Sequence, residues 1–205
     1  MNVAGNLFII IAPSGAGKTT LVNALLKKIS NLVLSISHTT RPRRSREKPD
    51  TNYFFVDEDT FKSMIEEDAF LEHAKVFSHY YGTSRKWVEQ ELAQGVDVIL
   101  EIDWQGAVQI KKLYPDCVSI FILPPSINAL QERLHRRKQD TKEVIDNRLR
   151  EAKIEMSHCH EFDYLVVNQR FNTALIQLRA IITAERIRTA RQCKKQKELI
   201  ARLLD

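Results

Sequence analysis

The segment 9–20, IIIAPSGAGKTT, combines the residue types that hold the phosphates of a nucleotide. Its part from Ala12 to Thr19 matches G-x-x-x-x-G-K-[ST] at every defined position except the first, where alanine replaces glycine. Gly15 and Gly17 allow the backbone to curl so that its N–H groups point at phosphate oxygens. The segment therefore predicts a phosphate-binding loop, called the P-loop below.

Two side chains of the P-loop add chemistry to its backbone. Lys18 would reach the β- and γ-phosphates, and the Thr19 hydroxyl would ligate Mg²⁺. A helix beginning near Lys18 would turn its positive end toward the same oxygens. The residues expected to bind ATP here are Ala12, Pro13, Ser14, Gly15, Ala16, Gly17, Lys18, Thr19 and Thr20.

A P-loop leaves open where the phosphate goes, because switches, motors and kinases all contain one. The tetrapeptide DWQG at Asp103–Gly106 matches the D-x-x-G of switches that hydrolyse GTP. Such a switch normally also has N-K-x-D to recognise guanine, and this sequence lacks it. A switch is therefore the weaker alternative.

A second group of residues suits a second nucleotide. The basic stretch SHTTRPRR (37–44) has three arginines, and Tyr53 and Tyr81 follow it. Guanidinium groups and phenol hydroxyls together bind a dianionic phosphate well. Glu72 could accept hydrogen bonds from both N1–H and the 2-amino group of guanine, a donor pair that adenine lacks. Taken alone, the basic stretch would equally suit RNA or an acidic partner.

The elements that carry these residues alternate between strand and helix. Apolar runs at 7–12, 95–103, 117–125 and 162–167 predict buried strands, and helical patterns follow the first three. From Phe171 onward we expect one long helix with Leu175, Leu178 and Ile182 on one face. This order predicts an α/β fold with a parallel sheet wrapped by helices.

Two polar excursions interrupt this alternation. Residues 37–94 are expected to form an insertion that is partly β, and the charged stretch 135–155 should be helical after Thr141. The predicted organisation is a core of residues 1–36 and 95–205, with a lid at about 131–157 inside it.

Composition limits the class of protein. The 205 residues have a net charge of +5, which suits an anionic partner. The three cysteines show no paired spacing, and we find neither an apolar run of membrane-spanning length nor a signal peptide. We therefore expect a cytoplasmic protein with free thiols and no membrane partner.

The motifs APSGAGKT, SHTTR, YFFV, FLEHA, YYGTS and IDWQGA resemble those of guanylate kinases, especially the bacterial ones. They occur in the same order and extend from Ile9 through VVN at 166–168 into the last helix. The resemblance implies a P-loop three-layer sandwich with a mostly parallel sheet, a small GMP-binding insertion and a helical lid. It also implies transfer of the γ-phosphate of ATP to GMP with Mg²⁺; the sequence does not distinguish GMP from dGMP.

The resemblance further implies roles for individual residues. Arg41, Arg44, Tyr53 and Tyr81 would hold the phosphate of GMP, and Glu72 would recognise guanine with help from Ser37, Thr83 and Asp103. Glu101 matches an acidic position near the metal and completes the expected GMP site. Arg133, Arg137 and Arg148 match lid arginines that close over the ATP phosphates, and Asn168 matches a contact to the adenine end. The expected catalytic groups are Lys18, Arg44, Arg137 and Arg148.

The sequence departs from the family pattern in two places. The family usually has a glycine in the loop after its second arginine, whereas SREKPD (45–50) has none. The lid commonly contains G-R-G, where this chain has Arg136, Arg137 and Lys138. Loss of these glycines should stiffen or move the hinge of the lid.

Other functions remain as alternatives. A module that binds peptides without catalysis would not need the intact Gly17-Lys18-Thr19. A nucleic-acid-dependent NTPase would be expected to place aromatic residues among the basic residues of 185–202, and none occurs there. His158, Cys159 and His160 could be metal ligands, but neighbouring residues of a helix point in different directions. We expect ATP and GMP as partners and no nucleic acid; the sequence does not predict the oligomeric state.

Overall fold

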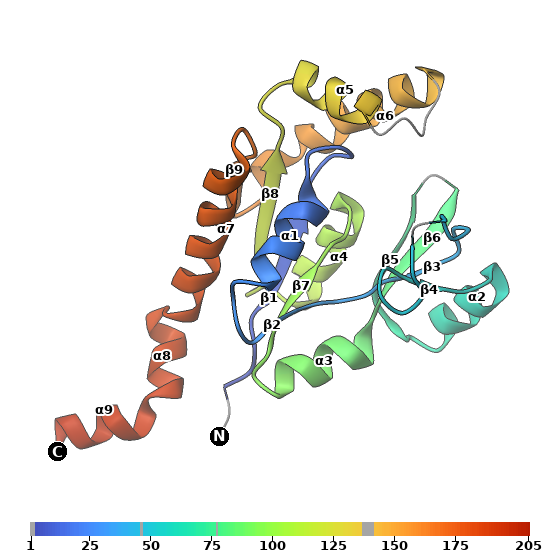
Figure 1. Ribbon diagram of the computed structural model, residues 1–205. Helices are drawn as coiled ribbons and strands as arrows, with labels where there is room; N and C mark the ends of the chain where they lie inside the picture. The colour runs from blue at the N-terminus through green and yellow to red at the C-terminus, as the bar shows by residue number, and fades with distance from the viewer. Residues whose placement is uncertain (1–2, 46, 77, 137–141) are drawn as a thin grey trace.

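The computed structural model describes residues 3–45, 47–76, 78–136 and 142–205. Its centre is a five-stranded sheet in the order β2-β7-β1-β8-β9, and every neighbouring pair is parallel (Figure 1). The strands are β1 (Leu7–Ile11), β2 (Leu32–Leu34), β7 (Asp97–Leu100), β8 (Val118–Leu123) and β9 (Tyr164–Val167). The parallel sheet predicted from the sequence is confirmed.

Helices cover both faces of this sheet, which makes three layers. Along β1, Phe8 and Ile10 pack into one hydrophobic cluster, while Ile9 and Ile11 pack into another. This alternation follows from the two-residue period of a strand, and it explains why the strand is apolar throughout. The helices are α1 (Lys18–Leu26) and α7 (Phe171–Arg186) on the first face, and α3 (Arg85–Ala93) and α4 (Trp104–Leu113) on the second.

The insertion forms a separate four-stranded sheet in the order β4-β3-β6-β5. Its elements are β3 (His38–Thr39), β4 (Phe54–Phe55), α2 (Glu58–Glu66), β5 (Phe70–Val76) and β6 (His79–Ser84). Two reciprocal hydrogen bonds tie it to the core: the Gln109 side chain donates to the His73 carbonyl at 2.9 Å and accepts from its N–H at 3.2 Å. Strand β5 therefore lies fixed against α4.

The helices α5 (Ile127–Arg136) and α6 (Lys142–Ser157) lie at the P-loop end of the sheet (Figure 1), and the short 3-10 helix η1 (Cys159–Glu161) connects α6 to β9. They have their own small apolar cluster, which includes Leu130, Leu134, Ile145 and Ala152. Helix α6 begins where the sequence predicted helix to resume. The predicted Arg137 lies outside the described residues.

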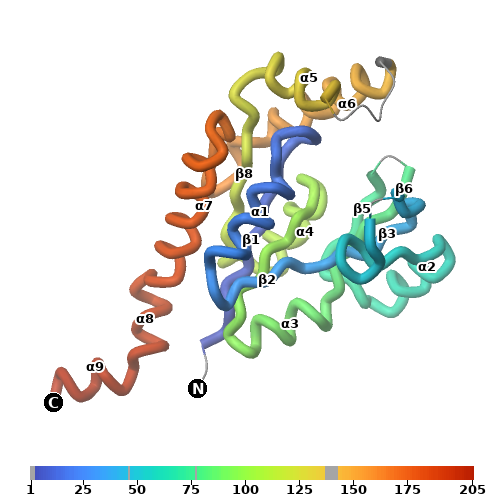
Figure 2. Tube along the Cα trace, viewed as in Figure 1, coloured from blue at the N-terminus to red at the C-terminus, as the bar shows by residue number. Residues whose placement is uncertain are grey.

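The C-terminal segment differs from the single long helix that we expected. It consists of three helices, α7, α8 (Thr189–Lys195) and α9 (Lys197–Leu204), which lead away from the end of the molecule that carries α5 and α6 (Figure 2). Helix α7 ends because Arg188 adopts an extended backbone (φ −52°, ψ 137°). The Gln192 side chain then donates a hydrogen bond to the Arg186 carbonyl at 2.9 Å, which satisfies an acceptor at the end of α7.

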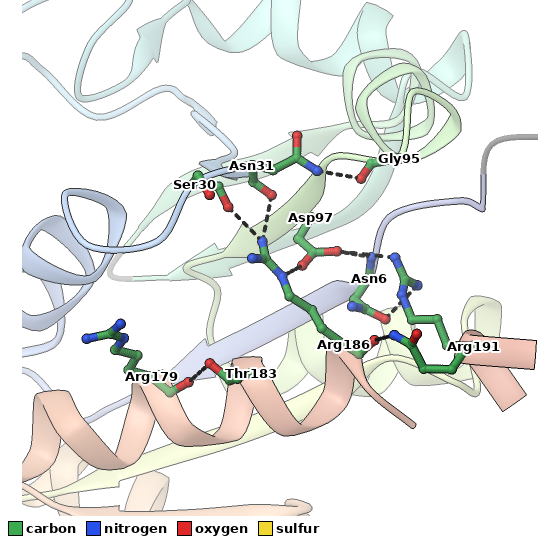
Figure 3. Close-up of polar contacts among 10 residues, drawn as sticks. Asn6, Ser30, Asn31, Gly95, Asp97, Arg179, Thr183, Arg186 and Arg191 are labelled. Atoms are coloured by element: carbon green, nitrogen blue, oxygen red, sulfur yellow. Dashed lines mark hydrogen bonds and ion pairs between the residues drawn. The ribbon is translucent and has the colours of Figure 1, made fainter. Parts of the chain in front are cut away.

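A buried carboxylate holds the end of α7 to the sheet (Figure 3). Asp97, at the start of β7, is 1% exposed and lies 2.7 Å from Arg186 Nε and 3.6 Å from Arg191 Nη2. It also accepts a hydrogen bond from the Asn6 N–H at 2.6 Å. Arg186 in turn donates to the Asn31 carbonyl at 2.9 Å. Four segments that are distant in sequence are thus linked through the side chains of Asp97 and Arg186.

No helix within the described ranges is both long enough and apolar enough to cross a membrane.

Candidate functional site

The P-loop connects β1 to α1 through two glycines in the left-handed region. Gly15 has φ 94° and Gly17 has φ 95°, conformations that side-chain-bearing residues rarely adopt. The Ala16 N–H donates to the Pro13 carbonyl at 3.0 Å, which tightens the turn. Helix α1 then begins at Lys18, as the sequence predicted.

Asn168 and Arg133 hold the P-loop through hydrogen bonds to its backbone. Asn168, directly after β9, is buried and donates from Nδ2 to the Ala16 carbonyl at 2.7 Å. Arg133, on α5, donates to the same carbonyl at 3.1 Å and to the Asn168 carbonyl at 3.0 Å. Both residues were predicted to contact ATP, and the structure places both against the loop that would hold its phosphates.

A cavity of about 150 Å³ lies between the P-loop, the insertion and the carboxyl end of β7. It brings together six of the nine residues predicted for GMP with two from the P-loop. These are Ser37, Tyr53, Glu72, Tyr81, Glu101 and Asp103, with Ala12 and Lys18. Residues more than 80 positions apart along the chain therefore line one space.

Glu72 is the most buried acid in this cavity. It lies on β5, is 4% exposed, and accepts a hydrogen bond from the Thr83 hydroxyl at 2.6 Å. Burial raises the pKa of Glu72 to about 7, and the nearby charge of Asp103 acts in the same direction. The Thr83 hydrogen bond opposes this rise without cancelling it. Thr83, predicted for the GMP site, lies behind Glu72 and orients it.

Asp103 and Glu101 follow β7 at the floor of the cavity. Asp103 caps α4, because its Oδ1 accepts a hydrogen bond from the Gly106 N–H at 2.8 Å. Oε1 of Glu101 is buried and has no hydrogen-bond partner among the described residues. A buried carboxylate oxygen without a partner is costly, so this atom is suited to a ligand or an ion.

Arg41 lies next to the tyrosines at the other end of the cavity. Its guanidinium carbon is 5.4 Å from the centre of the Tyr53 ring, and the Tyr53 and Tyr81 rings are 6.0 Å apart. Nη2 of Arg41 forms an ion pair with Glu47 Oε1 at 2.7 Å, and Nη1 donates to the Pro42 carbonyl at 2.8 Å. The guanidinium keeps further N–H groups for a phosphate.

The other two predicted arginines that the structure describes, Arg44 and Arg148, are not part of the cavity lining. Arg44 is exposed, and its backbone N–H donates to Glu47 Oε2 at 2.8 Å. Arg148 is partly buried on α6, near Glu151. Arg137 lies outside the described residues, and the catalytic role of Arg44 and Arg148 stays a prediction.

Sequence reasoning missed two acids of this region, Glu47 and Glu155. Burial would raise the pKa of Glu47, but the hydrogen bonds from Arg41 and the Arg44 backbone outweigh burial and hold that pKa below its usual range. Glu155, on α6, lines the cavity; burial raises its pKa to about 7, which the nearby Lys18 partly opposes. Its position seven residues after Arg148, on the same helix face, is a signal that could have identified it.

His158, one of the candidate metal ligands near the end of α6, has other partners. The His158 ring stacks on Trp104 with centroids 4.3 Å apart, and its Nδ1 lies 2.7 Å from Glu161 Oε1. Among the described residues, no group of three or more His, Cys, Asp or Glu side chains could hold a metal ion. The stack instead fixes the end of α6 against the first residue of α4.

Comparison with known proteins shows the family of this chain. Residues 4–185 match the family model described as guanylate kinase. The guanylate kinase of Coxiella burnetii is 54% identical over 205 residues, covering 100% of this chain and 99% of its own. That of Escherichia coli O157:H7 is 55% identical over 202 residues, covering 98% of each chain. The crystal structure of guanylate kinase from Anaplasma phagocytophilum superposes with a TM-score of 0.79 at 34% identity, covering 93% of this chain and 90% of that one. The sequence motifs, the fold and these similarities agree, and the chain belongs to the guanylate kinase family.

Proposed function

We propose that ATP binds at the P-loop and GMP between the insertion and the core, with the cavity at the point of transfer. Membership of the family gives the reaction, the ATP-dependent phosphorylation of GMP to GDP with release of ADP. The observation that carries the placement is the cavity itself. Its lining includes Lys18 from the P-loop and Glu72 and Tyr81 from the insertion.

On the donor side, backbone N–H groups of the P-loop and the positive end of α1 would bind the ATP phosphates. Asn168 and Arg133 hold the Ala16 carbonyl, so the curl of the loop is fixed before ATP arrives. Lys18 would reach the γ-phosphate.

The residues present fit Mg²⁺ as the metal of this site. The Thr19 hydroxyl is exposed in the first turn of α1, and Glu101 presents a buried carboxylate oxygen without a partner in the described structure. Hard oxygen donors of this kind suit Mg²⁺, which usually binds few protein groups together with phosphates and water. When bound, Mg²⁺ would neutralise charge on the transferred phosphoryl group.

On the acceptor side, Glu72 would bind N1–H and the 2-amino group of guanine, with Ser37, Thr83 and Asp103 around it. Arg41, Tyr53 and Tyr81 would hold the phosphate, and Arg44 would reach it from the surface. In this arrangement the base would lie at the buried end, and the phosphate would lie beside Arg41 and the two tyrosines.

Transfer in this site depends on positioning and on charge neutralisation. The acceptor is already a phosphate anion, so no strong general base is required. The convergence of anionic oxygens is the main obstacle, and Lys18, Arg44 and Arg148 would offset it. Closure of the lid over the phosphates would exclude water as a competing acceptor.

We also propose that the protein works in the cytoplasm. Cys117, Cys159 and Cys193 are free thiols, which suits a reducing compartment.

A coupled assay for ADP tests the function directly. GMP, AMP, CMP and UMP are offered as acceptors, with and without RNA or DNA. We expect ADP release with GMP and a rate for AMP lower by about 10⁴-fold, because a buried carboxylate without donors rejects the wrong base. Equal rates with all four acceptors, or stimulation by nucleic acid without an acceptor, would contradict the proposal.

A further inference from the structure

Gly106 occupies a position where glycine is not needed for the backbone. It is the third residue of α4, it is buried, and its φ angle is not positive. Glycine in such a helical position destabilises a protein by roughly 0.5–1 kcal/mol relative to alanine. The reason for Gly106 must therefore lie in its surroundings.

The space that a side chain would need at position 106 is taken by Glu72. A Cβ atom built on Gly106 would lie 2.5 Å from Glu72 Oε2 and 3.1 Å from its Cδ. The other oxygen of Glu72 is held by Thr83 at 2.6 Å, and the side chain is almost completely buried. The carboxylate therefore lies directly against the backbone of α4 and cannot withdraw without losing its hydrogen bond.

The same residue also fixes the second acid of the base pocket. The Gly106 N–H donates to Asp103 Oδ1 at 2.8 Å. One residue thus orients Asp103 through its N–H group and admits Glu72 through its missing side chain. The two contacts come from different atoms, and both act on acids that line the cavity.

We infer that Gly106 is a positioning residue that determines guanine specificity, because it gives Glu72 the room to reach the base. This inference rests on the proposed role of Glu72. It assigns a function to the last residue of DWQG that has nothing to do with a GTP-hydrolysing switch.

The test is the substitution Gly106→Ala, measured as kcat/KM for GMP and for AMP. A displacement of the carboxylate by about 1 Å should lower kcat/KM for GMP by about 10²-fold and narrow the ratio between GMP and AMP. Gln105→Ala is the matched control, since this neighbour lies in the same turn of α4 but is exposed. A Gly106→Ala variant with the wild-type GMP-to-AMP ratio would overturn the inference.

Variants of Glu72 distinguish a steric clash between Glu72 and the new alanine from a general loss of stability. With Glu72→Ala the obstacle is gone, so adding Gly106→Ala should cause no further loss of kcat/KM for GMP. The double variant should melt at or above the temperature of Glu72→Ala, because alanine favours the helix. Glu72→Gln keeps the bulk of the side chain, so Gly106→Ala should lower its melting temperature by about 5 °C.

These variants distinguish a failure of the proposed base pocket from a failure of the role inferred for Gly106. If Glu72→Ala leaves the GMP-to-AMP ratio unchanged, the proposed base pocket is wrong. If Glu72→Ala abolishes the preference but the losses from Gly106→Ala add to it, only the role of Gly106 is wrong. Should Gly106→Ala alone fail to fold, folding of the double variant supports the inference, and failure of the double variant overturns it.

Discussion

The Thr83 hydroxyl donates a hydrogen bond to Glu72 Oε1 over 2.6 Å in a space almost closed to water. This bond and a hydrogen bond from the Thr83 backbone offset only part of the burial of Glu72, whose pKa is raised to about 7. The ligand-free protein therefore holds an acid that is costly to ionise until a base arrives with hydrogen-bond donors.

We predict that the ligand-free protein loses stability as the pH rises through 7. The folded-state pKa of Glu72 lies above its ordinary value of 4.5, so the folded protein binds this proton more tightly than the unfolded chain. The resulting stability, on the order of a few kcal/mol, is complete below pH 4.5 and is lost through pH 7. Urea unfolding from pH 5 to 8 measures it. Glu72→Gln should remove this part of the pH dependence, whereas the exposed Glu66→Gln should retain it.

Base selection should depend on the charge of Glu72. Glutamine keeps the size of the side chain but offers guanine one acceptor and one donor instead of two acceptors. We expect kcat/KM for GMP to fall by at least about 10²-fold in Glu72→Gln, with a narrower gap between GMP and AMP. Steady-state kinetics with both acceptors measure this. Arg44→Ala should lower GMP turnover while the preference for guanine stays; an unchanged ratio in Glu72→Gln would refute the assignment.

Glu47 should set the affinity for the phosphate of GMP. Its two oxygens bind Arg41 Nη2 and the Arg44 N–H, so it fixes the guanidinium next to Tyr53. Loss of one charge-assisted hydrogen bond in Glu47→Gln should raise KM for GMP about 10-fold and leave kcat nearly unchanged. Calorimetry should show weaker binding of GMP but not of guanosine, which lacks the phosphate. A matching loss for guanosine would mean that Glu47 acts on the fold of the insertion rather than on Arg41.

Asp97 should matter for stability and not for catalysis. It is buried at the end of the sheet far from the P-loop and pairs with Arg186 and Arg191. Asp97→Asn leaves these cations without a counter-charge and should lower the free energy of unfolding by about 3 kcal/mol. Below the melting transition, kcat/KM should stay at its wild-type value. The exposed pair of Glu58 and Lys62 provides the control, because Glu58→Gln should leave the melting temperature unchanged.

The parts of the fold that the sequence predicts are those with a strong local signal. The apolar run of β1 and the glycines of the P-loop specify their conformations through short-range patterning, and both occur where expected. Strand β2 has only three residues, too few for a period to emerge. The break after α7 brings both Arg186 and Arg191 to Asp97, a contact that no local pattern encodes.

The candidate site shows the same difference between residues with a local sequence signal and residues without one. Motifs predicted Glu72 and Asp103, which both line the cavity, but the involvement of Glu47 and Glu155 follows from contacts formed only in the folded chain. Asn168 and Arg133 were expected at the nucleotide, and their support of Ala16 depends on how β9 and α5 pack around the P-loop. A side chain that acts on the backbone of another segment carries no signature of that role in its own sequence.

The cavity between the P-loop and the insertion also has an excess of acidic over basic side chains. Of the described residues that line it, Glu72, Glu101, Asp103 and Glu155 are acidic, and Lys18 is the single basic one. Arg41 lies at one end, beyond Tyr53. A nucleotide that enters with its phosphate first would bring this anion next to carboxylates. A nucleotide that enters with its base first would find hydrogen-bond acceptors for its N–H groups, and its phosphate would remain beside Arg41. We therefore expect the pocket to reject a backward substrate as well as a wrong one, and free phosphate to compete poorly for its inner end.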